Sequence, residues 1–434
     1  MLREEKLNSD HRVYKVYSRR YFILVLYCFS IVLVGFQQLQ YTSIANVIVK
    51  YYNVNPVAVN WTNLSQNVCT VLFSYHIGKL IEKIGLRKSM ILFALLSTFG
   101  AAIKCFTFAR NKFWLMMVGQ LILSLFFTPT YSLCPLLGAL WFKPKEIALV
   151  VGLTNASMTF GMALTFLLPA LVFKDDSINE VKFNLVDISV ILLMTEAAIL
   201  LLTLFVVEER PPTSPSLAEE ARINYEIPKV MDVLRNKNFI LIIICYASGG
   251  ASNQLLSVTL NQSILSEFVN GDIVLSISGI LLLITGIPGS LIIGMISKIY
   301  PKYKRLLISI YSTVVICQIL FLLSLWLHCD SLLYVSLIFF GGLNSASSIL
   351  ALDFLIEVSF PFTENIAFAI AFSAYALPNL ILVPLMTKLM EKCAAVYANF
   401  IFLSLGIFSL ISTLCVTEDL RRRQANTEST PLLS

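Results

Sequence analysis

The sequence has little charge. Only 13% of its 434 residues are Asp, Glu, Lys or Arg, whereas 57% are hydrophobic. A soluble domain of this length needs a more polar surface, so the composition excludes a water-soluble globular protein and indicates a chain that lies in a lipid bilayer. Because lipid satisfies no backbone hydrogen bonds, the long apolar runs must be helices of about 20 residues.

Patterns that serve catalysis or metal binding are also missing. The nine cysteines form no CxxC pair, and the three histidines, His11, His76 and His328, are scattered along the chain. The sequence contains neither HExxH nor GxSxG. The sequence therefore predicts no metal, no cofactor and no enzyme activity. We interpret the cysteines as small residues that pack between helices.

Twelve apolar runs are long enough to cross a bilayer. The predicted spans are 21–49, 60–81, 88–109, 113–137, 146–173, 185–207, 238–266, 273–297, 304–327, 332–356, 364–388 and 394–416. The sequence therefore predicts an all-α membrane protein of twelve transmembrane helices.

Charge predicts how these spans are oriented and grouped. Most of the 32 Lys and Arg residues fall in the even-numbered connections and the terminal segments, which places both termini in the cytosol. We therefore attribute the net charge of +6 to basic residues on the cytosolic side of the membrane, and we do not predict nucleic-acid binding. The predicted parts are an N-terminal tail (1–20), a six-helix bundle (21–207), a proline-rich cytoplasmic linker (208–237), a second six-helix bundle (238–417) and a C-terminal tail (418–434).

A loop motif supports two related halves. Glycines, an acidic residue and a basic pair follow the second span, and a weaker copy beginning at Gly294 follows the eighth. The residues of the first copy are Gly78, Glu82, Gly85, Arg87 and Lys88. This loop resembles the signature cytoplasmic loop of the major facilitator superfamily. The resemblance implies two pseudo-symmetric six-helix bundles, a mid-membrane substrate site and alternating access, with the glycine allowing close helix approach and the Glu82 charge relay stabilising the outward-open state.

Further segments are similar to the feline leukemia virus subgroup C receptor-related family. They include Ile44-Ala-Asn46-Val47, Val59-Asn60-Trp61, Ala139-Leu140-Trp141-Phe142 and Asn236-Lys237-Asn238-Phe239. The resemblance implies transport of a small metabolite of the heme, choline or ethanolamine class. It also shows departures: the family's aromatic cage, a tryptophan in helix one and a tyrosine in helix seven, falls on Gln38 and Gln254, and its glutamines in helices five and eleven fall on Thr159 and Ala376.

Amide side chains are the strongest candidates for contacts to the solute. Polar groups inside lipid are costly unless they face a cavity or a partner helix. The candidates are Gln38 and Gln254 first, then Gln37, Tyr41, Ser257, Asn261, Gln120 and Thr159. Such groups suit a hydroxylated, amide or zwitterionic metabolite. The alternative is that they make interhelical hydrogen bonds worth about 0.6 kcal/mol each.

Charged residues considered within or near the spans are Lys104, Glu196, Asp353 and Glu357. Ion coupling would need such groups. Because Lys104 can reach the outer interface and Glu357 can pair with a basic loop, uncoupled facilitated movement is the favoured prediction and ion-coupled transport the alternative. With no histidine at a predicted cavity wall, heme could be recognised only through its propionates.

Short surface motifs complete the predictions. Asn60 and Asn63 begin glycosylation sequons at the outer mouth of the second span. Glu428, Leu432 and Leu433 form an acidic dileucine pattern, which predicts clathrin-adaptor sorting and a plasma-membrane or endosomal and lysosomal location. A monomer in contact with lipid is expected. A receptor that has the transporter fold without transport is a further alternative.

Overall fold

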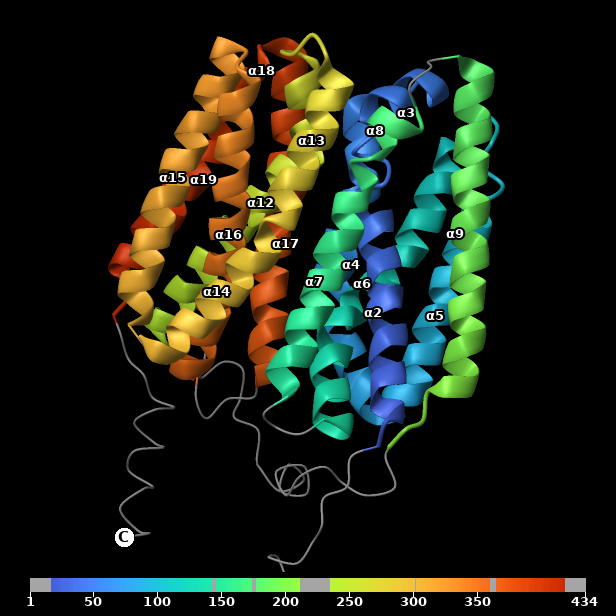
Figure 1. Ribbon diagram of the computed structural model, residues 1–434, viewed down its shortest axis with the longest axis vertical. Helices are drawn as coiled ribbons and strands as arrows, with labels where there is room; N and C mark the ends of the chain where they lie inside the picture. Colours follow the sequence, from blue (N-terminus) through green and yellow to red (C-terminus); the bar gives the residue numbers. More distant parts are fainter. Residues whose placement is uncertain are drawn as a thin grey trace, which may run out of the picture.

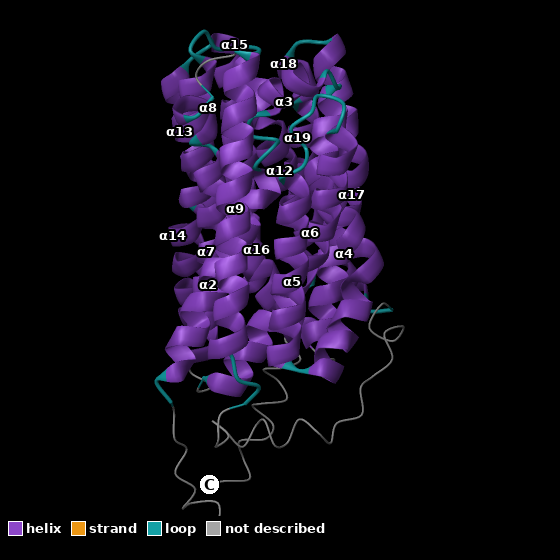
Figure 2. Ribbon diagram, turned by 90° about the vertical axis from the view of Figure 1, so that its right-hand side faces the viewer, coloured by secondary structure: helices purple, strands orange, loops and turns teal. Residues whose placement is uncertain are grey.

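The computed structural model describes residues 17–142, 146–173, 177–210, 235–300, 302–359 and 364–417. Within these ranges the chain is helical and contains no strand. Each predicted span coincides with a long helix or with two consecutive shorter ones. The helices run along one axis, as two perpendicular views show (Figure 1, Figure 2).

The first half of the chain supplies one group of helices. They are α2 (Arg19–Leu39), α3 (Ala45–Tyr52), α4 (Pro56–Ile84), α5 (Leu86–Lys104), α6 (Phe113–Trp141), α7 (Ile147–Thr165), α8 (Leu168–Leu171) and α9 (Ile178–Val206).

The second half supplies the other group, which stands beside the first in Figure 1. Its helices are α12 (Lys237–Leu265), α13 (Gly271–Ile284), α14 (Gly286–Ile299), α15 (Tyr303–Leu327), α16 (Asp330–Ser359), α17 (Glu364–Lys392), α18 (Ala395–Ala398) and α19 (Phe400–Cys415). We call the end that carries α3, α8 and α18 the α3 end (Figure 1). The opposite end, where α9 stops and α12 begins, is the linker end.

Several predicted spans are not continuous helices, which corrects the prediction. The first span breaks after α2, and 40–44 form turns before α3 begins. The fifth, eighth and twelfth spans are interrupted by only one or two residues, Phe166 and Leu167, Thr285, and Asn399, whose backbone stays in the right-handed helical region. Non-helical backbone at membrane depth is tolerated where protein buries it, and Tyr41, Thr42 and Ile44 in the first break are all buried.

Hydropathy separates one helix from the rest. Among the described residues, ten helices are long and apolar enough to cross a membrane by length and composition, and α6 contributes a shorter apolar stretch, Phe113–Leu125. The long helix α4 does not qualify, because its first half is rich in amides and hydroxyls, from Asn60 to Asn67. Large apolar side chains such as Phe205 and Trp326 are exposed, which suits a surface in contact with lipid.

Glycines bring α2 and α7 into close contact. A Cβ atom at Gly161 would lie 2.0 Å from the carbonyl oxygen of Val32, and one at Gly35 would lie 2.3 Å from that of Met158. Backbones therefore touch here, as they do at small-residue interfaces of membrane helices. Between the two groups, the main contacts join α4 to α17 and α7 to α13.

Candidate solute site and inter-bundle network

A small cavity lies among helices of the first bundle. Its walls are formed by Val34, Gln37, Gln38, Gln66, Gln120, Leu123 and Ser124, from α2, α4 and α6. Its interior has about 20 Å³ of space for the centres of water molecules. That volume admits a water molecule and is too small for an organic solute. The three glutamines predicted from helices one and four thus meet at one cavity, which is too narrow for a solute in this conformation.

Two amide oxygens at this cavity have no hydrogen-bond partner. Gln120 is 4% exposed, and its Nε2 donates to the backbone oxygen of Gln37 at 2.9 Å. Its Oε1 is buried and unpaired, as is Oε1 of the half-buried Gln38. Unpaired buried acceptors cost free energy. The cavity is therefore an acceptor-rich place to which a donor group would bind favourably.

Gln37 links two buried charges behind this cavity. Its Nε2 donates to Oε1 of Glu196 at 2.8 Å, and its Oε1 accepts from Nζ of Lys104 at 3.4 Å. Lys104 is 1% exposed and Glu196 2%. The prediction that Lys104 reaches the outer interface is therefore wrong: its side chain turns into the bundle, with Nζ 5.1 Å from the ring centroid of Tyr41.

Gln254 lies at the centre of an amide network between the bundles. Its Nε2 donates to Oδ1 of Asn63 at 2.7 Å and of Asn67 at 3.2 Å. Its Oε1 accepts from Nδ2 of Asn67 at 3.2 Å and of Asn379 at 2.9 Å. We call Asn63, Asn67, Gln254 and Asn379 the amide network. It joins α4, α12 and α17, so in this conformation the Gln254 side chain holds the bundles together.

Further hydrogen bonds cross between the bundles nearer the α3 end. Nδ2 of Asn261 donates to the backbone oxygen of Ser43 at 2.9 Å and to Oδ1 of Asn46 at 3.0 Å. Nδ2 of Asn60 donates to Oγ1 of Thr387 at 2.7 Å. Together with the amide network, these contacts close the molecule from its middle to the α3 end.

The asparagines of both predicted sequons are buried by this packing. Asn60 is 0% exposed and Asn63 1%. Both side-chain amides donate inside the protein, Asn60 to Thr387 and Asn63 to the backbone oxygen of Gln38 at 3.1 Å. A position buried between helices leaves no room for a glycan, so neither asparagine is available for glycosylation in this conformation.

The remaining predicted contact residues lie away from the cavity wall. The hydroxyls of Ser257 and Thr159 donate to backbone oxygens of their own helices, at 2.8 Å and 3.0 Å. Tyr41 is 3% exposed beneath Lys104, and Ala376 is fully buried in α17. Contact of the predicted residues with a solute stays a prediction, and the structure distributes them among the cavity, the amide network and helix surfaces.

The predicted gating loop lies at the linker end. Gly85 has φ 82°, a conformation that favours glycine, and the Glu209 carboxylate occupies the space of a Cβ there. That carboxylate accepts from the backbone nitrogens of Leu86 at 2.8 Å and Arg87 at 3.1 Å, so it caps the first turn of α5. At Gly78, in contrast, a Cβ would meet nothing within 4 Å, so the predicted close helix approach is absent.

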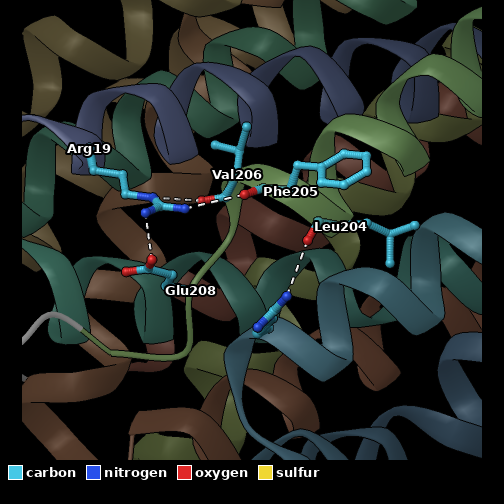
Figure 3. A network of polar contacts seen from close by, with 6 residues as sticks. Arg19, Leu204, Phe205, Val206 and Glu208 are labelled. Atoms are coloured by element: carbon cyan, nitrogen blue, oxygen red, sulfur yellow. Dashed lines mark hydrogen bonds and ion pairs between the residues drawn. The ribbon is translucent and has the colours of Figure 1, made fainter.

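Figure 3 shows the surrounding polar contacts, which stay within the first half of the chain. Arg87 donates to the backbone oxygen of Leu204 at 3.1 Å, whereas Lys88 is exposed. Arg19 donates to the backbone oxygen of Val206 at 3.0 Å and pairs with Glu208 at 2.5 Å. The start of the linker is thus fastened to α2, α5 and α9. The side chain of Glu82 lies outside the described set, as does the whole dileucine pattern of Glu428, Leu432 and Leu433.

Metal ligands are not clustered in the part of the chain that the structure describes. No group of three or more His, Cys, Asp or Glu side chains there is arranged to hold a metal ion. His76 is exposed on α4, and His328 follows α15 with a half-exposed side chain beside Glu267.

Sequence reasoning missed three groups that line the site or join the bundles. Gln66 lines the cavity, and Asn67 and Asn379 belong to the amide network. The polar run from Asn60 to Asn67 inside an apolar stretch was the available signal, since amides within a span face a cavity or a partner helix. Nothing comparable marks Asn379, a single amide between two prolines of α17.

Comparisons with known proteins agree with this architecture. A family model described as Major Facilitator Superfamily matches residues 23–365. An uncharacterized MFS-type transporter of Caenorhabditis elegans is 28% identical over 98% of this chain and 73% of its own length. The choline/ethanolamine transporter flvcr2a of Danio rerio is 25% identical over 96% of this chain and 90% of its own. The choline/ethanolamine transporter FLVCR1 of Mus musculus is also 25% identical, over 94% of this chain and 77% of its own length.

Solved structures show the same fold. A crystal structure of a D-xylose-proton symporter superposes with a TM-score of 0.73 at 14% identity, over 92% of this chain and 99% of that chain. A partially occluded inward-open conformation of the xylose transporter XylE from E. coli superposes with a TM-score of 0.70 at 14% identity, over 93% of this chain and 99% of that chain. At this identity the likeness concerns the fold alone.

Proposed function

Because the chain belongs to the Major Facilitator Superfamily and is a multi-pass membrane transporter that works by alternating access, we propose that its solute is a small amino alcohol of the ethanolamine class. The similarity to choline/ethanolamine transporters supports the class. Within that class, the acceptor-rich cavity supports ethanolamine over choline.

One observation carries this choice: the unpaired carbonyl oxygens of Gln38 and Gln120 at the cavity. A primary ammonium has three N–H donors that can satisfy such acceptors, whereas the quaternary ammonium of choline has none and depends on aromatic faces. The family positions of those faces are Gln38 and Gln254 here. Hydrogen bonds to a charged group contribute about 1.5–3 kcal/mol each, so the loss of one donor lowers affinity about tenfold or more.

A methylation series tests the proposal. Uptake of ethanolamine, N-methylethanolamine, N,N-dimethylethanolamine and choline is measured in proteoliposomes containing the purified chain. We expect uptake to fall along the series as N–H donors are lost. Gln38→Trp, which places an aromatic ring at the family's position, should shift the preference towards choline. Gln318→Met removes a buried amide elsewhere, in α15, and should leave the order unchanged. Preferential uptake of choline by the wild-type chain would contradict the proposal.

The setting of the transporter is part of the proposal. Basic residues gather at the linker end, including Arg19, Lys83 and Arg87, which supports a cytosolic location for that end and for both termini. The two groups of helices would be the moving bundles, joined by the linker 208–237. We propose that the chain acts as a monomer and that Leu432 and Leu433 direct it through clathrin adaptors to endosomes or lysosomes. Enrichment at the cell surface when both leucines are changed to alanine tests the sorting signal.

A further inference from the structure

The two charges behind the cavity are joined by a single amide. Gln37 presents its nitrogen to the Glu196 carboxylate and its oxygen to the Lys104 ammonium. No direct ion pair joins Lys104 to Glu196, although the structure describes both residues. We call Lys104, Gln37 and Glu196 the triad. It connects α5, α2 and α9.

Because the triad is buried, its net charge strongly affects the free energy of this region. Both charged side chains are at most 2% exposed, and taking a charge out of water costs several kcal/mol unless an opposite charge compensates it. A glycine at position 119 admits the lysine, since a Cβ there would lie 3.0 Å from Cγ of Lys104. A merely structural pair would be best compensated by direct contact. Here an amide that also lines the cavity separates the charges.

Other titratable groups near the triad do not ionise at neutral pH in water. They are the Tyr41 ring under the lysine, the thiol of Cys105 on α5 and the phenol of Tyr52 on α3, whose hydroxyl donates to the backbone oxygen of Thr107. From α6, the neighbouring side chain is the neutral amide of Gln120. Lys104 and Glu196 therefore set the charge of this region.

The cavity would respond to a proton on Glu196. With the carboxylate ionised, the triad is neutral overall, and a cationic solute can enter beside it. With the carboxyl protonated, the Lys104 ammonium is uncompensated one amide away from the cavity wall and repels a cation. Proton and cationic solute thus oppose each other through Gln37.

We propose that the triad is a proton site that couples transport to electroneutral exchange of one cationic solute for one proton. As the solute binds, Glu196 releases its proton to the aqueous side to which the site is open. When the solute leaves, a proton returns from the other side. The identity of the solute in this inference rests on the proposed function. Ion-coupled transport replaces the predicted uncoupled movement, because Lys104 is buried and does not reach the interface.

The first experiment does not depend on transport. Infrared difference spectra of the purified full chain are recorded between pH 5.5 and pH 8, for the wild type, Glu196→Gln and Glu357→Gln. We expect a carboxyl band that appears at acidic pH, is absent in Glu196→Gln and persists in Glu357→Gln. Glu357 is a fitting control because it is a carboxylate with one buried, unpaired oxygen outside the triad. A spectrum that is the same in the wild type and Glu196→Gln overturns the proposal.

The second experiment measures proton movement in proteoliposomes with a trapped pH dye as ethanolamine is added outside. We expect the wild-type lumen to become alkaline faster than protein-free vesicles, which report passive entry of the neutral amine. The double variant Lys104→Met with Glu196→Gln, a neutral triad that leaves no unpaired charge, should transport ethanolamine without moving protons. Ethanolamine uptake by the wild type without proton movement overturns the coupling and leaves the proposed function standing. A Glu196 band without any ethanolamine uptake supports the proton site and refutes the proposed solute.

Discussion

Replacing Gln254 with methionine should open the α3 end of the molecule. Methionine fills a similar volume, but it removes all four hydrogen bonds that Gln254 makes to Asn63, Asn67 and Asn379. Interhelical hydrogen bonds in membrane proteins average about 0.6 kcal/mol, so four of them contribute about 2.4 kcal/mol to the closed state. That free energy corresponds to a shift of about 50-fold in the ratio of closed to open molecules.

The shift can be measured without a solute. Spin labels on cysteines at Asn111 and Val269, both exposed near the α3 end on opposite bundles, report the distance between the bundles there. Exposed Cys393 and Cys415 are changed to serine in this background. We expect Gln254→Met to populate a longer distance that is rare in the parent chain.

A matched variant separates opening from general destabilisation. Gln318 is also a fully buried glutamine, but its Nε2 donates to Ser252 and to the backbone oxygen of Phe402 within one bundle. Gln318→Met should lower thermal stability and leave the distance distribution unchanged. Equal distributions in the parent and Gln254→Met, or an identical change in both variants, would refute the role of the amide network.

Three further predictions follow from the packing. Asn60→Gln and Asn63→Gln should leave the gel mobility of the expressed chain unchanged, with or without a glycosidase, because both asparagines are buried; a mobility shift on enzyme treatment would contradict this. Glu209→Ala should lower the stability of the folded chain by about 1 kcal/mol through loss of the α5 cap, and Glu209→Gln by less, as thermal unfolding would show. Gly161→Ala should reduce the folded yield in size-exclusion chromatography, because its Cβ meets a backbone oxygen, whereas Gly78→Ala should not; equal yields would oppose the packing argument.

The overall fold was predictable because its signal is repeated along the chain. Long apolar runs force helices in lipid, and twelve of them with a motif that recurs after the second and eighth spans leave little freedom of architecture. The breaks within spans were not predictable, since 40–44 leave the helix inside a run of otherwise helical composition. Tertiary packing that buries the released backbone decides such breaks.

Side-chain direction was the main limit for the candidate site. Lys104 is the last residue of α5, where snorkelling is a reasonable expectation, but whether it turns outward or inward depends on the neighbours that α6 and α9 supply. A sequon likewise carries no information about burial: Asn60 and Asn63 match the sequence pattern, but their side chains are buried. The grouping of Gln37, Gln38 and Gln120 at one cavity combines residues from α2 and α6, which spacing within one helix cannot reveal.

The polar character of α4 has a consequence for the order in which the protein is made. Its amides find partners on Gln254 and Thr387, which are synthesised long after α4 leaves the ribosome. Until then, a helix too polar to enter lipid by its own hydropathy must be sheltered by α2 and α6 or by the insertion machinery. Completion of the second bundle is therefore a step in the biogenesis of the first, and an N-terminal fragment alone should be held back and degraded.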